Sequence, residues 1–266
     1  MPLAVCATPI GNLEDVTLRV LAELRAAHVV LCEDTRHTRG LLQRHGIEAR
    51  LVSYHEHNEA SRTAELLPRL EAGERIALVT DAGMPGVSDP GARIVRAALE
   101  AGVEVTVLPG ASAVETALVA SGLMAERYQF VGFLPRGPKA LSDLWDELSG
   151  WRWPAVAFES PQRLPATLRS LAAADPGRVV AVCRELTKRF EEVVVGSASE
   201  MAGRFAQAPK GEITLVLGPA AGGPENETAF EVVAELVAAG VARRRAAELV
   251  SRLTGVSRNE LYRRTL

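Results

Sequence analysis

Cysteine is scarce in this chain, and its scarcity excludes several kinds of site. Only three cysteines occur among 266 residues, Cys6, Cys32 and Cys183, and they lack the spacing of a zinc or disulfide motif. Each lies in an apolar, strand-like run, so we expect reduced, buried thiols of the kind usual in the cytoplasm. A catalytic cysteine is disfavoured for the same reason.

Long apolar runs and a leader segment are also missing. No run approaches the roughly 20 residues needed to cross a bilayer, although 47% of the residues are hydrophobic. Residues 1–5 lack the basic start of a secretory signal and have the pattern of a first strand. We therefore expect a cytoplasmic protein with no membrane partner.

Several familiar motifs are absent. The chain has no GxGxxG, no P-loop, no GxSxG and no HExxH, so the usual nucleotide, hydrolase and metalloprotease patterns lose their main support. A nicotinamide oxidoreductase stays an alternative because Glu33 lies 22 residues after Gly11, where an acid would hold a ribose. A metal site formed by His37, His55 and His57 is another alternative, but no further ligand has a diagnostic spacing, so we expect no metal.

Charge is unevenly distributed. The whole chain has a net charge of −3, yet residues 241–266 hold seven arginines and two glutamates, so the rest carries −8. A basic tail on an acidic body suggests a polyanionic partner. A solvated helix face would have the same composition, and both interpretations stay open.

Strand-like and helical patterns alternate along the first half, which predicts an α/β fold with parallel strands and crossover helices. Strands are expected at Ala4–Thr8, Val29–Leu31, Leu51–Ser53, Ile76–Thr80 and Val103–Leu108. Helices are expected near 17–26, 37–45, 59–72, 90–101 and 112–121, the last with Ser112 as its N-cap.

The alternation restarts after residue 123 and predicts a second α/β unit. Strands are expected at Gln129–Phe133, Ala155–Phe158, Val179–Cys183, Glu192–Val195 and Ile213–Leu217, and helices near 138–149, from Ser160-Pro161 onward, and near 197–206. The short join at 119–126 should hold the two units face to face around a cleft.

The end of the chain is expected to be helical only. Residues 219–225 have the composition of a linker, and helical patterns follow at 228–239, 242–253 and 257–264. We therefore predict an N-terminal α/β domain over 1–120, a second over 121–220 and a small basic helical segment over 221–266.

Three turns rich in small residues follow strands of the first unit, at 8–12, 81–91 and 109–113. The longest holds three glycines and two prolines between a strand and a helix, far longer than the roughly 2–6 residues of most such connections. Small residues at the carboxyl edge of a parallel sheet let a ligand approach the backbone closely. We interpret the three turns together as one wall of a ligand site.

Specific segments of the chain resemble a known family. TPIGNLEDVTLR, VVLCEDTRHTRGLL, YHEHNE, LVTDAGMPGVSDPG, LPGASA, FESPQRL, RELTKRFEE and KGEITLVLG resemble the ribosomal RNA small subunit methyltransferase I family, which belongs to the tetrapyrrole methylase superfamily. The resemblance runs from about residue 3 to 218, and SRLTGVSRNELY is similar to the family's C-terminal helical piece. EDTRHT and YHEHNE separate it from relatives that methylate tetrapyrroles.

The resemblance implies a homodimeric enzyme that uses S-adenosyl-L-methionine to methylate the 2′-oxygen of a cytidine ribose in the decoding region of 16S ribosomal RNA. It also implies two α/β domains with the cofactor in the cleft between them. The residues that should touch the cofactor are Pro9, Gly11, Asp81, Ala82, Gly83, Met84, Pro85, Val87, Ser88, Ala111, Ser112, Ala113, Phe158, Leu186 and Gly211.

Methyl transfer to a ribose hydroxyl gains from a base or an orienting hydrogen bond near that hydroxyl. The candidates are Asp34, His55 and Glu159, and the sequence does not choose among them. Cations that should position RNA phosphates are Arg36, Arg184 and Lys188 in the α/β units and Arg243, Arg244, Arg245 and Arg258 in the tail. Methylation of a tetrapyrrole on the same fold and non-catalytic RNA binding stay alternatives.

Overall fold

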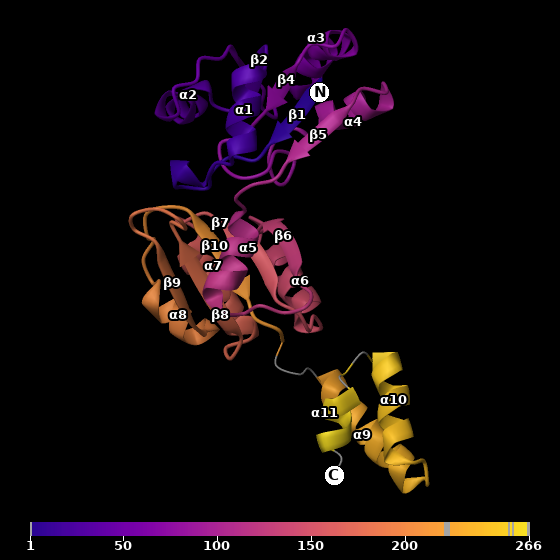
Figure 1. Cartoon of the computed structure of the whole chain (residues 1–266). Coiled ribbons are helices and arrows are strands. Elements are labelled where there is room, and N and C mark those ends of the chain that lie inside the picture. Colours follow the sequence, from indigo (N-terminus) through magenta and orange to yellow (C-terminus); the bar gives the residue numbers. More distant parts are fainter. Residues whose placement is uncertain (1, 221–223, 255, 257, 265–266) are drawn as a thin grey trace.

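The computed structural model describes residues 2–220, 224–254, 256 and 258–264, and two five-stranded sheets form its centre (Figure 1). The first sheet has the order β3-β2-β4-β1-β5, and all of its neighbouring strands are parallel. Its strands are β1 (Leu3–Cys6), β2 (Val29–Cys32), β3 (Leu51–Ser53), β4 (Ile76–Leu78) and β5 (Val105–Leu108). The predicted parallel arrangement is confirmed for this sheet.

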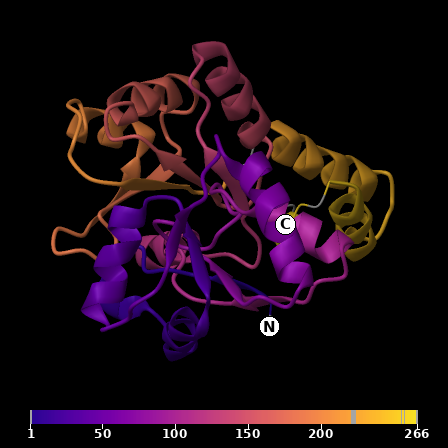
Figure 2. The ribbon, with the colours of Figure 1, turned by 90° about the horizontal axis from the view of Figure 1, so that it is seen from above.

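Helices cover both faces of the first sheet, as the view from above also shows (Figure 2). One face packs against α1 (Leu18–Ala26) and α2 (Thr35–Arg44), and the other against α3 (Glu59–Glu71) and α4 (Ala92–Glu100). Burial on both faces explains why its strands are almost continuously apolar. A short 3-10 helix, η1 (Leu13–Asp15), follows β1.

The second sheet has the order β6-β7-β10-β8-β9 and is mixed. Only β6 and β7 pair in parallel, whereas β10 is antiparallel to both neighbours and β8 is antiparallel to β9. The parallel arrangement expected from alternation therefore does not extend to this sheet, because no helix separates β8 from β9. Its strands are β6 (Gln129–Phe133), β7 (Ala155–Glu159), β8 (Val179–Arg184), β9 (Glu192–Ser197) and β10 (Ile213–Leu217).

The two faces of the second sheet have different neighbours. Helices α6 (Pro138–Ser149), α7 (Leu164–Ala174) and α8 (Ala198–Arg204) cover one face. The other face packs against α5 (Ala113–Ser121), which the sequence pattern assigned to the end of the first unit. The boundary between the two domains, judged by packing, therefore lies before α5 rather than after it.

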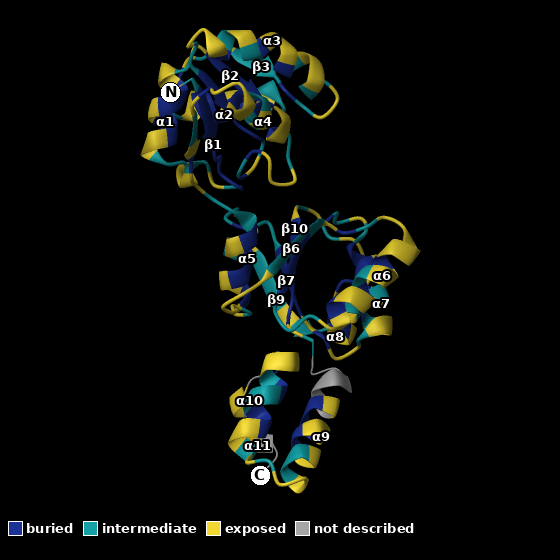
Figure 3. Cartoon of the chain, turned by 90° about the vertical axis from the view of Figure 1, so that its right-hand side faces the viewer, coloured by how far each residue is buried: buried dark blue, intermediate teal, exposed yellow. Residues whose placement is uncertain are grey.

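Three C-terminal helices have a core of their own and lie beyond the second domain in Figure 1. They are α9 (Pro224–Ala238), α10 (Arg243–Thr254) and α11 (Arg258–Arg264). Helix α9 begins inside the predicted linker, and residues 221–223 of that linker lie outside the described part of the chain. Figure 3 shows buried positions on the inward faces of these helices. Arg152 connects the second domain to them through a hydrogen bond to the carbonyl of Thr254.

One predicted helix start is wrong in detail, and the predicted N-cap at Ser112 is confirmed in position. Helix α7 begins at Leu164 rather than at Ser160-Pro161, because the Ser160 carbonyl accepts hydrogen bonds from Arg163 and Leu164 and forms a separate turn. Ser112 occupies the N-cap of α5, but its hydroxyl donates to the Glu115 carboxylate instead of capping the backbone.

All three cysteines are free and buried, as predicted. Within the described ranges, no helix has the length and apolar character of a membrane span.

Candidate functional site

The three small-residue turns meet at one edge of the first sheet. This follows from strand order, because β1 lies between β4 and β5 and all three strands run in parallel. Thr8 and Gly83 exchange two backbone hydrogen bonds of 2.8 and 3.1 Å, so the first and second turns are joined directly. The Ala7 N–H donates to the Leu108 carbonyl at 3.1 Å, next to the third turn. The expected convergence is confirmed.

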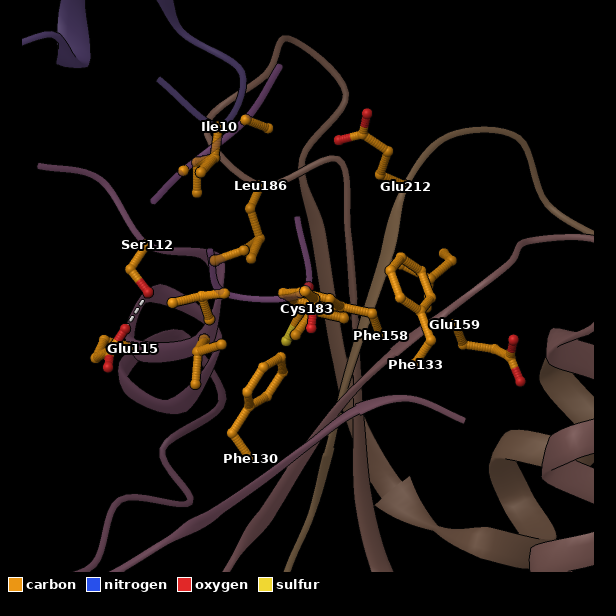
Figure 4. A pocket seen from close by; sticks show the side chains of 18 of the residues that line it. Ile10, Ser112, Glu115, Phe130, Phe133, Phe158, Glu159, Cys183, Leu186 and Glu212 are labelled. Carbon is orange, nitrogen blue, oxygen red and sulfur yellow. Dashed lines mark hydrogen bonds between the residues drawn. The ribbon is translucent and has the colours of Figure 1, made fainter. Parts of the chain in front are cut away.

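A cavity of about 740 Å³ lies between these turns and the α5 face of the second sheet. This volume is within the range of small-molecule sites. Figure 4 shows Ile10 and Ser112 on one side and Phe130, Phe133 and Phe158 on the other. The cofactor residues predicted from the sequence that line it are Ala82, Gly83, Met84, Val87, Ser88, Ser112, Ala113, Phe158, Leu186 and Gly211. Those that do not line it are Pro9, Gly11, Asp81, Pro85 and Ala111.

Gly11 has a different position from the one expected: it packs between the domains, next to the cavity. A Cβ atom on Gly11 would lie 2.6 Å from Cγ of Lys188 and 2.7 Å from the carbonyl oxygen of Leu186. Neither approach is sterically possible without movement. Glycine is therefore required here because the two domains touch backbone to backbone.

The opposing loop of the second domain has an unusual backbone. Glu185 and Thr187 have φ values of +53° and +64°, which non-glycine residues rarely adopt. Gly211 leaves room for the Glu185 side chain, because a Cβ there would lie 2.4 Å from the Glu185 Cγ. Backbone strain of this kind concentrates at functional sites, and here it aims Leu186 into the cavity.

The charged side chains among the lining residues of the cavity are carboxylates. Asp89 lines it, and burial raises its pKa to about 6, helped by the negative charges of Glu33 and Asp81. Burial together with Asp81 also raises the pKa of Glu33. Glu115 accepts from Ser112 and, at 2.6 Å, from the hydroxyl of Tyr128; burial raises its pKa, but these bonds outweigh burial and lower it overall.

Of the candidates for the base, Glu159 is among the residues that line the cavity, but its carboxylate is directed to the other side of the sheet. It follows Phe158 on β7, so its side chain points to the opposite face of the sheet. It accepts from Thr167 at 2.5 Å and from the N–H of Ser160 at 2.7 Å, and Arg163 lies 3.3 Å away. These partners make Glu159 a structural carboxylate of the α7 face.

Asp34 and Arg36 pair with each other outside the cavity. The Asp34 carboxylate accepts from the Arg36 backbone at 2.8 Å and from its guanidinium at 2.7 Å, and these hydrogen bonds lower the Asp34 pKa to about 2. The Asp34 N–H donates to Asp81 at 3.2 Å. A carboxylate of such low pKa is a weak base, so Asp34 is best described as the N-cap of α2.

His55 and Lys188 also lie outside the cavity lining. His55 Nε2 is 3.2 Å from the Asn58 amide, and its buried Nδ1 has no partner within the described residues. Lys188 donates to Glu212 at 2.8 Å and to Glu185 at 3.0 Å. Burial alone lowers the pKa of Lys188, but these two bonds outweigh it and raise the pKa.

The remaining predicted cations lie away from the cavity. Arg184 is held by Glu192 at 3.0 Å and by the carbonyl of Lys210. Arg244, Arg245 and Arg258 are exposed on the C-terminal helices, Arg243 is partly buried there, and Arg245 pairs with Glu248 at 3.1 Å. No group of three or more metal-binding side chains is found among the described residues, His37, His55 and His57 included.

Several lining residues were not named individually by the sequence reasoning, and these are Ile10, Asp89, Glu115, Tyr128, Phe130 and Phe133. Asp89 was within reach of a sequence argument, because it belongs to the 81–91 turn. The aromatic side chains could not be assigned to the site from the sequence, because apolar residues in a strand are predicted equally well to lie in the hydrophobic core.

Comparison with known proteins identifies the family. The family model for Tetrapyrrole (Corrin/Porphyrin) Methylases matches residues 2–202. Two curated relatives named Ribosomal RNA small subunit methyltransferase I, from Halalkalibacterium halodurans and Micromonospora olivasterospora, are 48% and 50% identical over 166 and 171 residues. These matches cover 62% and 64% of this chain but 57% and 55% of the relatives, so the chain spans little more than half of their length.

A solved structure shares the fold. Uroporphyrin-III C-methyl transferase from Thermus thermophilus, complexed with S-adenyl homocysteine, superposes with a TM-score of 0.57 at 20% identity. The superposition covers 81% of this chain and 96% of that one. The two-domain architecture expected from the sequence is thereby confirmed. With the match over 2–202, the chain belongs to the tetrapyrrole methylase family.

Proposed function

We propose that this protein transfers a methyl group from S-adenosyl-L-methionine to the ribose 2′-oxygen of a decoding-centre cytidine, cytidine 1402, in 16S ribosomal RNA. The observation that carries the proposal is the cavity between the domains, with small-residue turns on one side and aromatic rings on the other. The name of the curated relatives supports ribosomal RNA as the substrate. The expected cofactor agrees with the family, in which a solved relative binds S-adenyl homocysteine.

The residues of the cavity fit this cofactor. S-adenosyl-L-methionine supplies an electrophilic methyl group on a positively charged sulfur. Asp89, Glu115 and Glu212 give the cavity a negative lining, which favours a cation. Phe130 and Phe158 offer aromatic faces, which attract both cations and flat rings.

The main contribution of the protein to the reaction is to position the methyl donor and the ribose hydroxyl. Methyl transfer is an in-line displacement, and holding the two reactants in contact supplies much of the acceleration. The hydrogen bond of 3.0 Å from Asn12 to Thr187 joins the first domain to the 185–188 loop beside the cavity and so fixes where the two walls meet. Asp89 is the carboxylate we propose to accept or orient the proton of the ribose hydroxyl, because its pKa of about 6 lies closer to neutrality than that of Asp34.

Two further parts of the proposal concern partners. The exposed arginines of α10 and α11 contact phosphates beside the target nucleotide, which emerges from its helix to reach the cleft. The protein acts as a homodimer, as the resemblance implies, and in the cytoplasm, where reduced thiols are usual. Sedimentation equilibrium at micromolar concentration tests the dimer.

Methylation mapping at nucleotide resolution tests the activity. Ribosomal RNA from cells that lack the gene should miss one 2′-O-methyl group in the decoding region, and the wild-type gene should restore it. An unchanged map would contradict the proposal. Methyl transfer to a porphyrinogen, measured in parallel with labelled cofactor, separates it from tetrapyrrole methylation, which other members of the fold perform.

A further inference from the structure

A bulge in β6 brings two phenylalanines to the same face of the second sheet. Phe130 and Phe133 are three residues apart, so regular alternation would direct them to opposite faces. The register with β7 shifts between them, and Gly132 has φ +71°. Phe130 therefore pairs with Val156 and Phe133 with Phe158, both of which face the cavity side. A bulge that redirects a side chain beside a site is typical of functional strands.

The result is a continuous aromatic wall made of Phe130, Phe158 and Phe133. Ring centroids are 5.0 Å apart for the first pair and 5.4 Å for the second, and both pairs meet edge to face. Figure 4 shows the three rings in the cavity. Phe130 and Phe158 are partly buried, whereas Phe133 is 63% exposed. The outer ring thus presents a wide apolar surface to whatever enters the cavity.

We propose that Phe133 is the platform on which the base of the methylated nucleotide stacks. The inference rests on the proposed function and adds a substrate-positioning residue to it. A base removed from its helix loses its stacking partners, and an exposed aromatic ring replaces them. The inner rings, Phe130 and Phe158, are left for the adenine of the cofactor. A single wall then orients both flat rings in the cavity.

The surroundings of Phe133 fit a nucleotide. The turn after it is anchored by Arg163, whose guanidinium donates to the carbonyls of Leu134 and Pro135. Arg136 follows on the same turn and is exposed. Its guanidinium is placed to pair with a phosphate next to the stacked nucleotide. Ser88 contacts the bulge of β6: a Cβ atom on Gly132 would lie 3.6 Å from the Ser88 hydroxyl oxygen. The 81–91 turn therefore lies against the strand that carries Phe133.

The test compares Phe133→Ala with Phe133→Trp in the full-length protein. Substrates are small ribosomal subunits that lack the modification, with labelled S-adenosyl-L-methionine. We expect Phe133→Ala to lower kcat/KM for subunits about 10- to 100-fold, which corresponds to the loss of one stacked base. Phe133→Trp should keep most of the activity. The Kd for S-adenosylhomocysteine, measured by calorimetry, should change less than threefold in both variants.

Phe190→Ala is the matched control, because Phe190 is 65% exposed and does not line the cavity. An equal loss in this control would overturn the assignment, as would full activity of Phe133→Ala. A parallel rise in the S-adenosylhomocysteine Kd would mean that Phe133 contacts the cofactor instead. Altered sedimentation of Phe133→Ala would mean that the ring contacts a second copy of the chain. If the wild-type protein itself methylates no subunits, the proposed function fails rather than this inference.

Discussion

The backbone N–H of Asn12 donates to Oγ1 of Thr187 at 3.0 Å, and this hydrogen bond joins the two α/β domains next to the cavity. Asn12 follows the first strand of the first domain, whereas Thr187 lies in the strained loop of the second. Ile10 and Leu186, their neighbours, both line the cavity. The geometry of the site therefore depends on how closely the domains meet at this point.

Gly11→Ala should open this junction. The added methyl group would overlap Lys188 and the carbonyl of Leu186, so the domains must separate or the 185–188 loop must move. We expect a loss of about 1–3 kcal/mol in the free energy of unfolding and at least tenfold weaker binding of S-adenosylhomocysteine. Denaturant titration and calorimetry measure the two effects.

Gly40→Ala is the control for that substitution. Gly40 lies in α2, and a Cβ there would meet nothing within 4 Å. Alanine is the better helix former by about 1 kcal/mol, so this variant should be slightly more stable and should bind S-adenosylhomocysteine normally. Equal effects of the two substitutions would argue against a specific role for Gly11.

Asp89→Asn should stabilise the protein while reducing its activity. Because burial raises the Asp89 pKa from 3.8 to about 6, the folded state disfavours the charged form. The charge of Asp89 therefore destabilises the folded wild type fully above pH 6. The effect is absent below pH 3.8, the pKa of Asp89 in the unfolded chain. The variant should gain on the order of 1 kcal/mol at pH 7.5, after allowance for partial exposure, and nothing at pH 3.5. Unfolding curves across this range measure the difference.

Asp34→Asn should have the opposite pH dependence. The Arg36 hydrogen bonds lower the Asp34 pKa from 3.8 to about 2, so the charged form stabilises the fold above pH 3.8. That stabilisation disappears as the pH falls through 2. The variant should be less stable than the wild type at neutral pH and equal to it in strong acid. A constant difference at all pH values would show that the charge does not contribute.

Replacement of Arg244 and Arg258 by glutamine should weaken RNA binding without affecting the cofactor. A plot of the logarithm of the RNA-binding constant against the logarithm of the salt concentration has a negative slope. Each lost phosphate contact reduces the size of that slope by roughly 0.7–0.9. We expect a smaller slope for small-subunit RNA, measured by filter binding between 50 and 200 mM salt. An unchanged slope would remove the C-terminal helices from the RNA-binding surface.

The first domain and one wall of the site follow from the pattern of residues along the chain. Strands of that sheet are buried on both faces, so their apolar runs are clear, and parallel topology brings their carboxyl ends to one edge. The small-residue turns at 8–12 and 81–91 could therefore be assigned to a common wall from their residues alone. The shape of these turns is set locally, because glycine and proline determine which backbone angles are allowed at their own positions.

The second wall and the chemistry of individual side chains depend instead on how the two sheets pack. Strand register and the bulge at Gly132 direct Phe133 into the cavity, and alternation along β7 turns Glu159 away from it. Burial beside other carboxylates, rather than anything in the local sequence, raises the pKa of Asp89. The direction of a side chain and its pKa depend on neighbours distant in the chain, and these become neighbours only after the two sheets have packed.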